Sequence, residues 1–262
     1  DQSQEAADEQ QPTEVATPEN PVIRLSTTTS VNDSGLLPYL QPYFEAATGY
    51  TLEITSAGTG AAIEKARTGD ADALLVHSKS AEEEFINEGY GEERVPFMYN
   101  YFVIVGPESD PAGVADCATA VEAFAAIANS QSTFISRGDD SGTHKAELKI
   151  WETAGIEPSG DWYNSIGDGM GACLNIANEK QAYALSDKGT YLAHDNTLVV
   201  LLEKSDEMKN TYSMIAVTPE RYADTNYEGA LAFVNWMTSD EALDLIADYG
   251  VSEYGEPLFY VL

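Results

Sequence analysis

The chain has 262 residues, 43% of them hydrophobic, which is enough for one large domain or for two of about 100 to 150 residues. Its 13 basic and 44 acidic residues give a net charge of −31, which excludes nucleic acids and anionic membrane surfaces as partners because both attract Lys and Arg. No run approaches the roughly 20 apolar residues of a membrane span. A secretory signal is not visible either, as is also expected of a mature secreted protein.

Residues 1–21 form a segment of their own, with six acidic residues, three prolines and no basic residue. Such a segment buries too little apolar surface to offset the entropy lost on ordering. We therefore expect 1–21 to be a flexible acidic tether. This composition suits a protein held to a membrane by its N-terminus, with a plain disordered tail as the alternative.

Order is expected to begin at residue 22, where strands and helices alternate. The strands are predicted at 22–26, 50–54 and 73–76, and the helices at 36–47 and 61–67. This order indicates a parallel sheet with crossover helices, and in such sheets ligands bind beyond the carboxyl ends of the strands. The polar turns 27–30, 56–60 and 77–78 all follow strands at that edge.

The remaining chain is predicted to complete a second unit and then return to the first. Two longer strands, 98–106 and 213–217, enclose helices at 118–128, 143–154 and 170–179 and strands at 132–136, 182–185 and 197–202; a helical region at 228–249 follows. We expect two α/β lobes with open mixed sheets, helices on both sheet faces and a two-strand hinge. Lobe 1 would be 22–99 plus 217–262, and lobe 2 would be 100–216.

The most informative turn follows the strand at 132–136. Arg137 stands at the end of that strand, and Ser141-Gly142-Thr143 opens the next helix. Unpaired N–H groups and the positive dipole end at a helix start favour an anion, hydroxyls add donors, and Arg137 adds a charged fork. The alternative is a plain N-cap by Asp140 or Ser141, with Arg137 paired to Asp139. The combination favours an anion site.

Two further turns carry hydroxyl groups at helix starts. Thr27-Thr28-Thr29-Ser30 follows the first strand, and Thr59 lies between Gly58 and Gly60. Helix starts from both lobes can converge on one small anion. Neutral donors then bind it without a basic surface, which reconciles anion binding with the net charge of −31.

Catalytic and metal sites are poorly supported by the sequence. Ser141, His144 and Asp139 are too close along the chain for the converging side chains of a hydrolase triad. His77, His144 and His194 show no metal-ligand spacing. We expect no enzyme and no cofactor.

The two cysteines, Cys117 and Cys173, are an even pair with no metal-binding spacing. They can form a disulfide in an oxidising compartment or remain two buried thiols, and a disulfide is slightly favoured.

Taken together, several segments resemble the tungstate-binding proteins of ABC importers, from about Arg24 to Val217 and more loosely beyond. They include the two hydroxyl turns, the step from Arg137 through Ser141-Gly142-Thr143, and the segments 33–37, 69–77, 98–107, 169–171, 177–179 and 185–192. The Arg137 step also resembles phosphate-binding proteins. Ala172-Cys173 departs from the family pattern, which has a small residue and a Thr there.

The resemblance implies a two-lobed type II periplasmic-binding fold that closes on an oxyanion and docks on a membrane permease. It implies a monomer in the periplasm or at the outer face of the cytoplasmic membrane, with a lipid anchor as one mode of attachment. The ligand contacts it implies are Thr28, Thr29, Ser30, Thr59, Arg137, Ser141, Thr143 and Gly171. Tungstate is the expected ligand; molybdate, phosphate or sulfate, and an oxyanion sensor without transport, remain alternatives.

Overall fold

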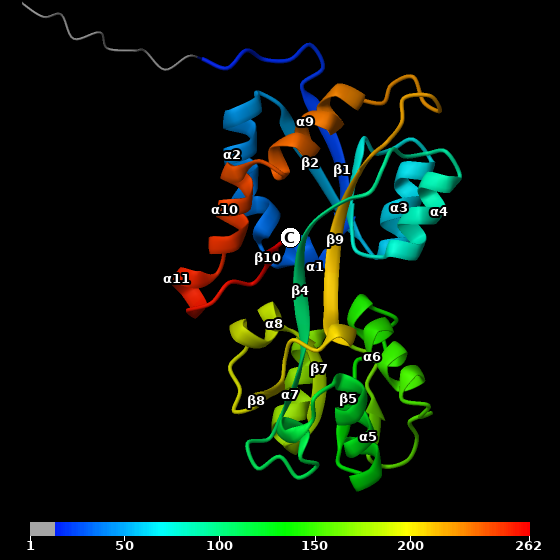
Figure 1. The fold of residues 1–262 in the computed structure, drawn as a ribbon, viewed down its shortest axis with the longest axis vertical. Coiled ribbons are helices and arrows are strands. Elements are labelled where there is room, and N and C mark those ends of the chain that lie inside the picture. The colour runs from blue at the N-terminus through cyan, green and yellow to red at the C-terminus, as the bar shows by residue number, and fades with distance from the viewer. Residues whose placement is uncertain (1–13) are drawn as a thin grey trace, which may run out of the picture.

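The computed structural model describes residues 14–262, so the first 13 residues of the predicted tether lie outside the described part of the chain. Figure 1 shows two groups of elements, one above the other, joined by strands β4 and β9. We call the upper group, with β1–β3, β10, α1–α4 and α9–α11, lobe 1. The lower group, with β5–β8 and α5–α8, is lobe 2.

Lobe 1 contains the predicted parallel strands. β1 (Val22–Thr28) lies between β2 (Thr51–Ala57) and β3 (Ala73–Val76) and pairs in parallel with both. The helices of this part are α1 (Thr29–Asp33), α2 (Leu36–Thr48), α3 (Thr59–Arg67) and α4 (Lys79–Asn87). Because all three strands run the same way, their carboxyl ends meet at one edge, and this part of the sequence prediction is confirmed.

β4 (Val95–Gly106) and β9 (Lys209–Ala216) are the two long strands that connect the lobes. They pair antiparallel from Val95 opposite Met214 to Tyr101 opposite Lys209. From Phe102 onward, β4 pairs instead with β7 and β8 of lobe 2. One strand thus belongs to the sheets of both lobes.

Lobe 2 has helices α5 (Ala120–Ser130), α6 (Gly142–Thr153), α7 (Met170–Lys180) and α8 (Lys188–Ala193), and strands β5 (Phe134–Ser136), β6 (Tyr163–Ser165), β7 (Tyr183–Asp187) and β8 (Val199–Leu202). Short 3-10 turns occupy Val114–Asp116 and Asp206–Met208. The chain returns to lobe 1 through α9 (Tyr227–Met237), α10 (Asp240–Asp248), α11 (Val251–Tyr254) and β10 (Tyr260–Val261).

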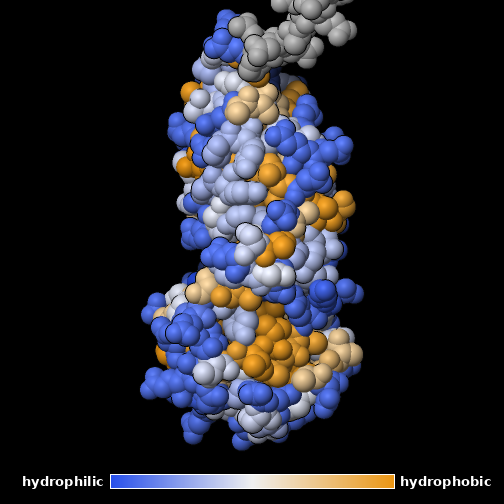
Figure 2. Space-filling view, turned by 90° about the vertical axis from the view of Figure 1, so that its left-hand side faces the viewer, coloured by the Kyte–Doolittle hydropathy of each residue, from blue (hydrophilic) through white to orange (hydrophobic). Residues whose placement is uncertain are grey.

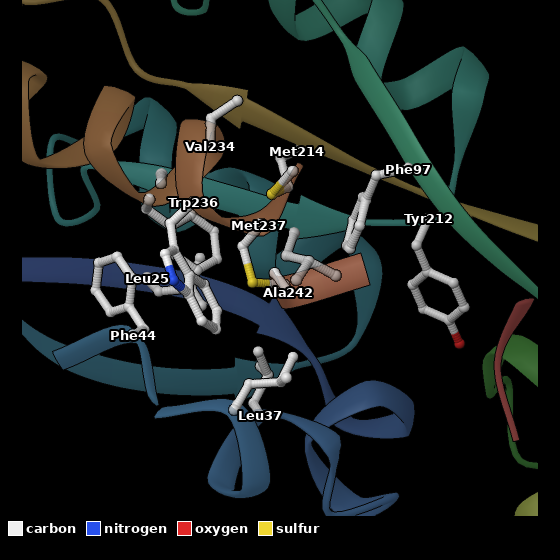
Figure 3. Close-up of a cluster of buried hydrophobic side chains, with 14 of the residues drawn as sticks. Leu25, Leu37, Phe44, Phe97, Tyr212, Met214, Val234, Trp236, Met237 and Ala242 are labelled. Atoms are coloured by element: carbon white, nitrogen blue, oxygen red, sulfur yellow. The ribbon is translucent and has the colours of Figure 1, made fainter. Parts of the chain in front are cut away.

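Hydrophobic cores lie on both faces of the sheet in each lobe. In lobe 1, Leu25 packs with α2 and α9 on one face, and Leu74 packs with α3 and α4 on the other. Figure 3 shows Phe44 of α2 beside Trp236 of α9, whose ring centroids are 5.6 Å apart. In lobe 2, successive residues of β4 point to opposite faces of the sheet, so that Ile104 packs into one core and Val105 into the other. The predicted coverage of both sheet faces is confirmed.

This layering also explains why the favoured disulfide is wrong. Cys117 and Cys173 are both free thiols. Cys117 packs into the core on the α5 side of the lobe 2 sheet, and Cys173 into the core on the α7 side. The sheet therefore separates them, and each S–H contacts a local carbonyl, of Gly113 and Ile135, at 3.6 Å.

The surface is mostly hydrophilic on the face drawn in Figure 2, as the charge predicts. Hydrophobic residues gather there over lobe 2, on the side where Figure 1 shows β8, each of whose residues is half-buried. Within residues 14–262 we found no helix that is long and apolar enough to cross a membrane.

Candidate functional site

A cavity of about 550 Å³ lies where the two lobes meet, and all eight residues implied by the sequence line it. Lobe 1 contributes Thr28, Thr29, Ser30 and Thr59, and lobe 2 contributes Arg137, Ser141, Thr143 and Gly171. The connecting strands add Asn100, Phe102, Asn210 and Tyr212. Residues more than 140 positions apart in the sequence are thus brought to one site.

The Thr-rich turn divides into a structural and a cavity-facing part. Thr27 is fully buried, and its hydroxyl donates to the carbonyl of Leu75 at 2.7 Å. Thr28 is the N-cap of α1, and its hydroxyl lies 3.3 Å from that of Ser30. Ser30 in turn lies 3.3 Å from the hydroxyl of Tyr212. The last three residues of the turn therefore supply hydroxyl groups to the cavity.

Three helices begin at the cavity without a side-chain cap. The N-caps of α1, α3 and α7 are Thr28, Gly58 and Gly169, and none caps its helix through a side chain. A Cβ added at Gly58, Gly169 or Gly171 would meet no heavy atom within 4 Å. Because the first N–H groups of a helix have no partner within it, these starts can donate to an anion in the cavity.

The start of α6 combines the two interpretations that the sequence left open. Ser141 does cap α6, since its hydroxyl oxygen accepts from the backbone N–H of His144 at 3.1 Å. A hydroxyl both accepts and donates, so the cap leaves the hydroxyl hydrogen of Ser141 to donate, with the Asp139 carboxylate as one acceptor. Capping and lining of the cavity therefore coexist at Ser141.

Arg137 is the one Arg or Lys among the described residues that line the cavity. Its Nη2 lies 2.7 Å from Oδ2 of Asp139, and its Nη1 lies 3.5 Å from Oγ1 of Thr143. Its Nε is buried and has no hydrogen-bond partner within residues 14–262. The ion pair holds the guanidinium in place and leaves it capacity for further acceptors.

Asp139 is kept ionised by its surroundings. Burial alone would raise the pKa of Asp139, but hydrogen bonds from Ser141 and the charge of Arg137 together lower this pKa below its ordinary value. Its carboxylate faces Arg137 and the N–H of Ser141 rather than lining the cavity. It is therefore placed as a partner of Arg137.

Several lining residues escaped the sequence interpretation as ligand contacts, among them His77, Asn100, Asn210 and Tyr212. His77 stands in a turn that had been singled out at the sheet edge, so its position carried a usable signal. The other three sit on long strands, where the sequence does not reveal which residues reach the cavity. Two acids, Asp33 and Asp187, also line it, and Asp187 caps α8 by accepting from Thr190 N–H at 2.8 Å.

The geometry does not assemble catalytic machinery from the residues considered. Ser141 accepts from the backbone of His144, and Nδ1 of His144 accepts from the backbone N–H of Asp140 at 3.0 Å. Nδ1 of His144 thus accepts a hydrogen bond from the backbone, whereas a triad would require the imidazole to accept one from the Ser141 hydroxyl. Nor do residues 14–262 contain a group of three or more His, Cys, Asp or Glu side chains able to hold a metal ion.

Comparison with known proteins agrees with this architecture. Residues 12–241 match the family model described as a PBP superfamily domain. The chain is 48% identical to the tungstate-binding protein TupA of Peptoclostridium acidaminophilum, over 90% of this chain and 84% of the relative. It is 39% identical to the solved tungstate-binding protein TupA of Desulfovibrio alaskensis G20, with a TM-score of 0.85 over 92% of this chain and 99% of that structure.

A second solved structure, described as the tungstate ABC transporter from Geobacter sulfurreducens, is 42% identical, with a TM-score of 0.76 over 87% of this chain and 98% of that one. These relatives are described as binding or transport proteins, not as enzymes. The family model covers most of the chain, and the relatives align along almost their whole length. This chain therefore belongs to the PBP superfamily and, within it, to the family of the tungstate-binding protein TupA.

Proposed function

We propose that this protein is the solute-binding protein of an ABC importer and that it captures tungstate in the cavity between its lobes. One observation carries the proposal: the starts of α1 and α3 from lobe 1 and of α6 and α7 from lobe 2 surround one cavity together with Arg137. Helix starts and hydroxyls are donors, and a tetrahedral oxyanion presents four acceptors in different directions. The proposed ligand contacts are the eight residues named above.

A fully ionised ligand fits this site better than a protonated one. Phosphate carries a proton at neutral pH and needs an acceptor, whereas tungstate needs only donors. Asp139 of the anion turn is engaged by Arg137 at 2.7 Å. Of the two acids that line the cavity, Asp187 accepts from the N–H of Thr190 at 2.8 Å, and Asp33 is exposed. An arrangement of this kind favours tungstate, with molybdate as the nearest alternative because its size and charge are almost the same.

The names of the relatives support the partner and the place of action. They describe tungstate-binding proteins and a tungstate ABC transporter. The partner is accordingly the membrane permease of the importer. The protein acts as a monomer in the periplasm or at the outer face of the cytoplasmic membrane, and we propose a lipid anchor as its mode of attachment.

Titration calorimetry with sodium tungstate, molybdate, sulfate and phosphate tests the proposal directly. We expect tight binding of tungstate and molybdate. Sulfate should bind far more weakly, because the donors cannot all reach a smaller dianion. Phosphate should also be weak, because an unpaired polar group in the site costs about 1–3 kcal/mol. Phosphate that binds as tightly as tungstate would make the protein a phosphate receptor.

A further inference from the structure

His77 occupies a place in the cavity that the proposed ligand contacts do not explain. It follows β3 at the carboxyl edge of the lobe 1 sheet, and its partly exposed side chain lines the cavity. Its ring centroid lies 5.0 Å from that of Tyr212, at an interplanar angle of 50°. The hydroxyl of Tyr212 reaches Ser30 at 3.3 Å. The imidazole is therefore adjacent to the hydroxyl groups at the start of α1.

The same ring also reaches the opposite lobe. A Cβ added at Gly142, the first residue of α6, would lie 3.5 Å from Cε1 of His77, which is ordinary van der Waals contact. The imidazole thus lies between the start of α1 in lobe 1 and the start of α6 in lobe 2. These are two of the helix starts at which the anion is proposed to bind.

The ring is neutral at physiological pH. Burial lowers the pKa of His77 to about 4, although the side chain of Asn210 acts in the opposite direction. A neutral imidazole carries one N–H donor and one acceptor nitrogen. Such a ring adds a directed donor to the cavity without adding charge, which is the property shared by the hydroxyls and backbone N–H groups around it.

We propose that His77 is a ligand-contacting residue whose ring N–H donates to an oxygen of the bound oxyanion, at the point where the two lobes meet. The inference rests on the proposed function, because it assigns a ninth donor to the same site. Its position between α1 and α6 places this donor where an anion held by both lobes can reach it. His77 is then a determinant of specificity, since an anion too small to span the lobes loses this contact first.

Two substitutions separate hydrogen bonding from packing. His77→Phe keeps a ring against Tyr212 and removes the donor, whereas His77→Gln keeps an N–H donor and loses the ring. In calorimetry with sodium tungstate at pH 7, we expect His77→Phe to weaken binding about threefold to tenfold and His77→Gln to stay within about twofold. His194→Phe is the matched control. His194 pairs with Asn175 and Asn196 and is not among the cavity-lining residues, so its replacement should change nothing.

The outcomes are distinguishable. Equal binding by wild type and His77→Phe overturns the inference and leaves the proposed function intact. Equal losses in His77→Phe and His77→Gln show that an N–H donor at this position does not restore binding, and they also overturn the inference. Wild-type protein that takes up none of tungstate, molybdate, sulfate or phosphate overturns the proposed function and this inference with it.

A measurement on the wild-type protein does not depend on the folding of any variant. Long-range ¹H–¹⁵N NMR of the histidine rings should show a neutral His77 at pH 7, and its N–H should become protected from solvent exchange on addition of sodium tungstate. Unchanged His77 ring signals in tungstate-saturated protein would overturn the proposal.

Discussion

Arg137 is the residue whose removal should weaken the site most. It supplies the one Arg or Lys charge among the lining residues described, and charge-assisted hydrogen bonds contribute about 1.5–3 kcal/mol. Arg137→Ala should therefore weaken tungstate binding by about tenfold to a hundredfold in calorimetry. Lys145→Ala is the control, because Lys145 is a largely exposed cation on the same helix, α6, outside the cavity. Equal affinities in the two variants would assign Arg137 a structural role.

The proposed contacts could be found from the sequence because most of them stand at a helix start directly after a strand. Ser141 and Thr59 are examples: a hydroxyl beside glycine at such a step already places a donor at the sheet edge. Tyr212 could not be found in this way. It is a strand residue with 1% exposure, and its hydroxyl reaches Ser30 only because β9 crosses between the lobes.

Glu147 is a buried acid of α6 that predicts how stability depends on pH. It is 2% exposed and accepts from Trp151 Nε1 at 3.0 Å and from the Tyr163 hydroxyl at 2.6 Å. Burial raises its pKa, although the hydrogen bonds from Tyr163 and Trp151 oppose the shift. The folded state thus holds a proton that the unfolded state has lost, and stability falls as pH rises from the unfolded pKa, about 4.3, through the folded one.

Replacement of the Glu147 carboxyl by an amide should remove this dependence of stability on pH. Glu147→Gln retains an oxygen that accepts from Trp151 and Tyr163, and it cannot ionise. The free energy of unfolding of the variant minus that of wild type should therefore be larger at pH 7.5 than at pH 5. Urea unfolding at both pH values measures the difference. Glu152→Gln, an exposed change on the same helix, should show no such trend. A Glu147→Gln difference that is the same at both pH values would contradict the assignment.

At the scale of elements, the periodicity of apolar residues identified most of the strands and longer helices, and contacts distant in sequence determined the rest. The helical region expected at 228–249 is two helices, α9 and α10, because Ser239 takes an extended conformation and caps α10. α1, α4, α8, α11, β6 and β10 were not predicted from the sequence. α8 has only six residues. β6 has three residues, all half-buried or exposed, so no apolar pattern in the sequence predicts its pairing with β5.

Lys188 at the start of α8 forms an ionic link between the lobes. Its ammonium group pairs with Glu203 within lobe 2 and, at 2.9 Å, with Glu256 on the segment between α11 and β10 of lobe 1. Nearby, a Cβ at Gly189 would lie 3.7 Å from Leu258. Desolvation lowers the pKa of Lys188, but the two carboxylates outweigh it and raise this pKa. An ion pair therefore connects the two lobes on this side of the cavity.

Loss of the link should speed the opening of the lobes. The Glu256 side chain is 41% exposed, so screening limits the pair to about 0.2–1 kcal/mol. Glu256→Gln should release tungstate up to about fivefold faster than wild type. The tungsten retained on protein after rapid desalting, followed over time by elemental analysis, measures this rate. Glu253→Gln, an exposed change on α11, should release at the wild-type rate. Identical rates in all three proteins would show that the pair does not restrain opening.

For the whole molecule, tungstate affinity should be nearly constant from pH 6 to pH 9. Binding depends on pH only if it takes up or releases protons. The cavity groups with shifted pKa values do not titrate in this range, since burial lowers the pKa of His77 to about 4 and raises the pKa of Tyr212 to about 12. Tungstate itself is fully ionised throughout this range. Calorimetry at three pH values tests this, and a steep slope would reveal a proton shared between the ligand and the site.

The acidic exterior and the donor-lined cavity have opposite effects on a dianion. At a distance the anion meets a net charge of −31 and is repelled, and it is attracted only within reach of the helix starts. Dissolved salt weakens the distant repulsion beyond about 8 Å and leaves the short contacts almost untouched. Capture should therefore become faster as ionic strength rises while release stays constant, a kinetic salt effect opposite in sign to that of receptors that steer their ligands by charge.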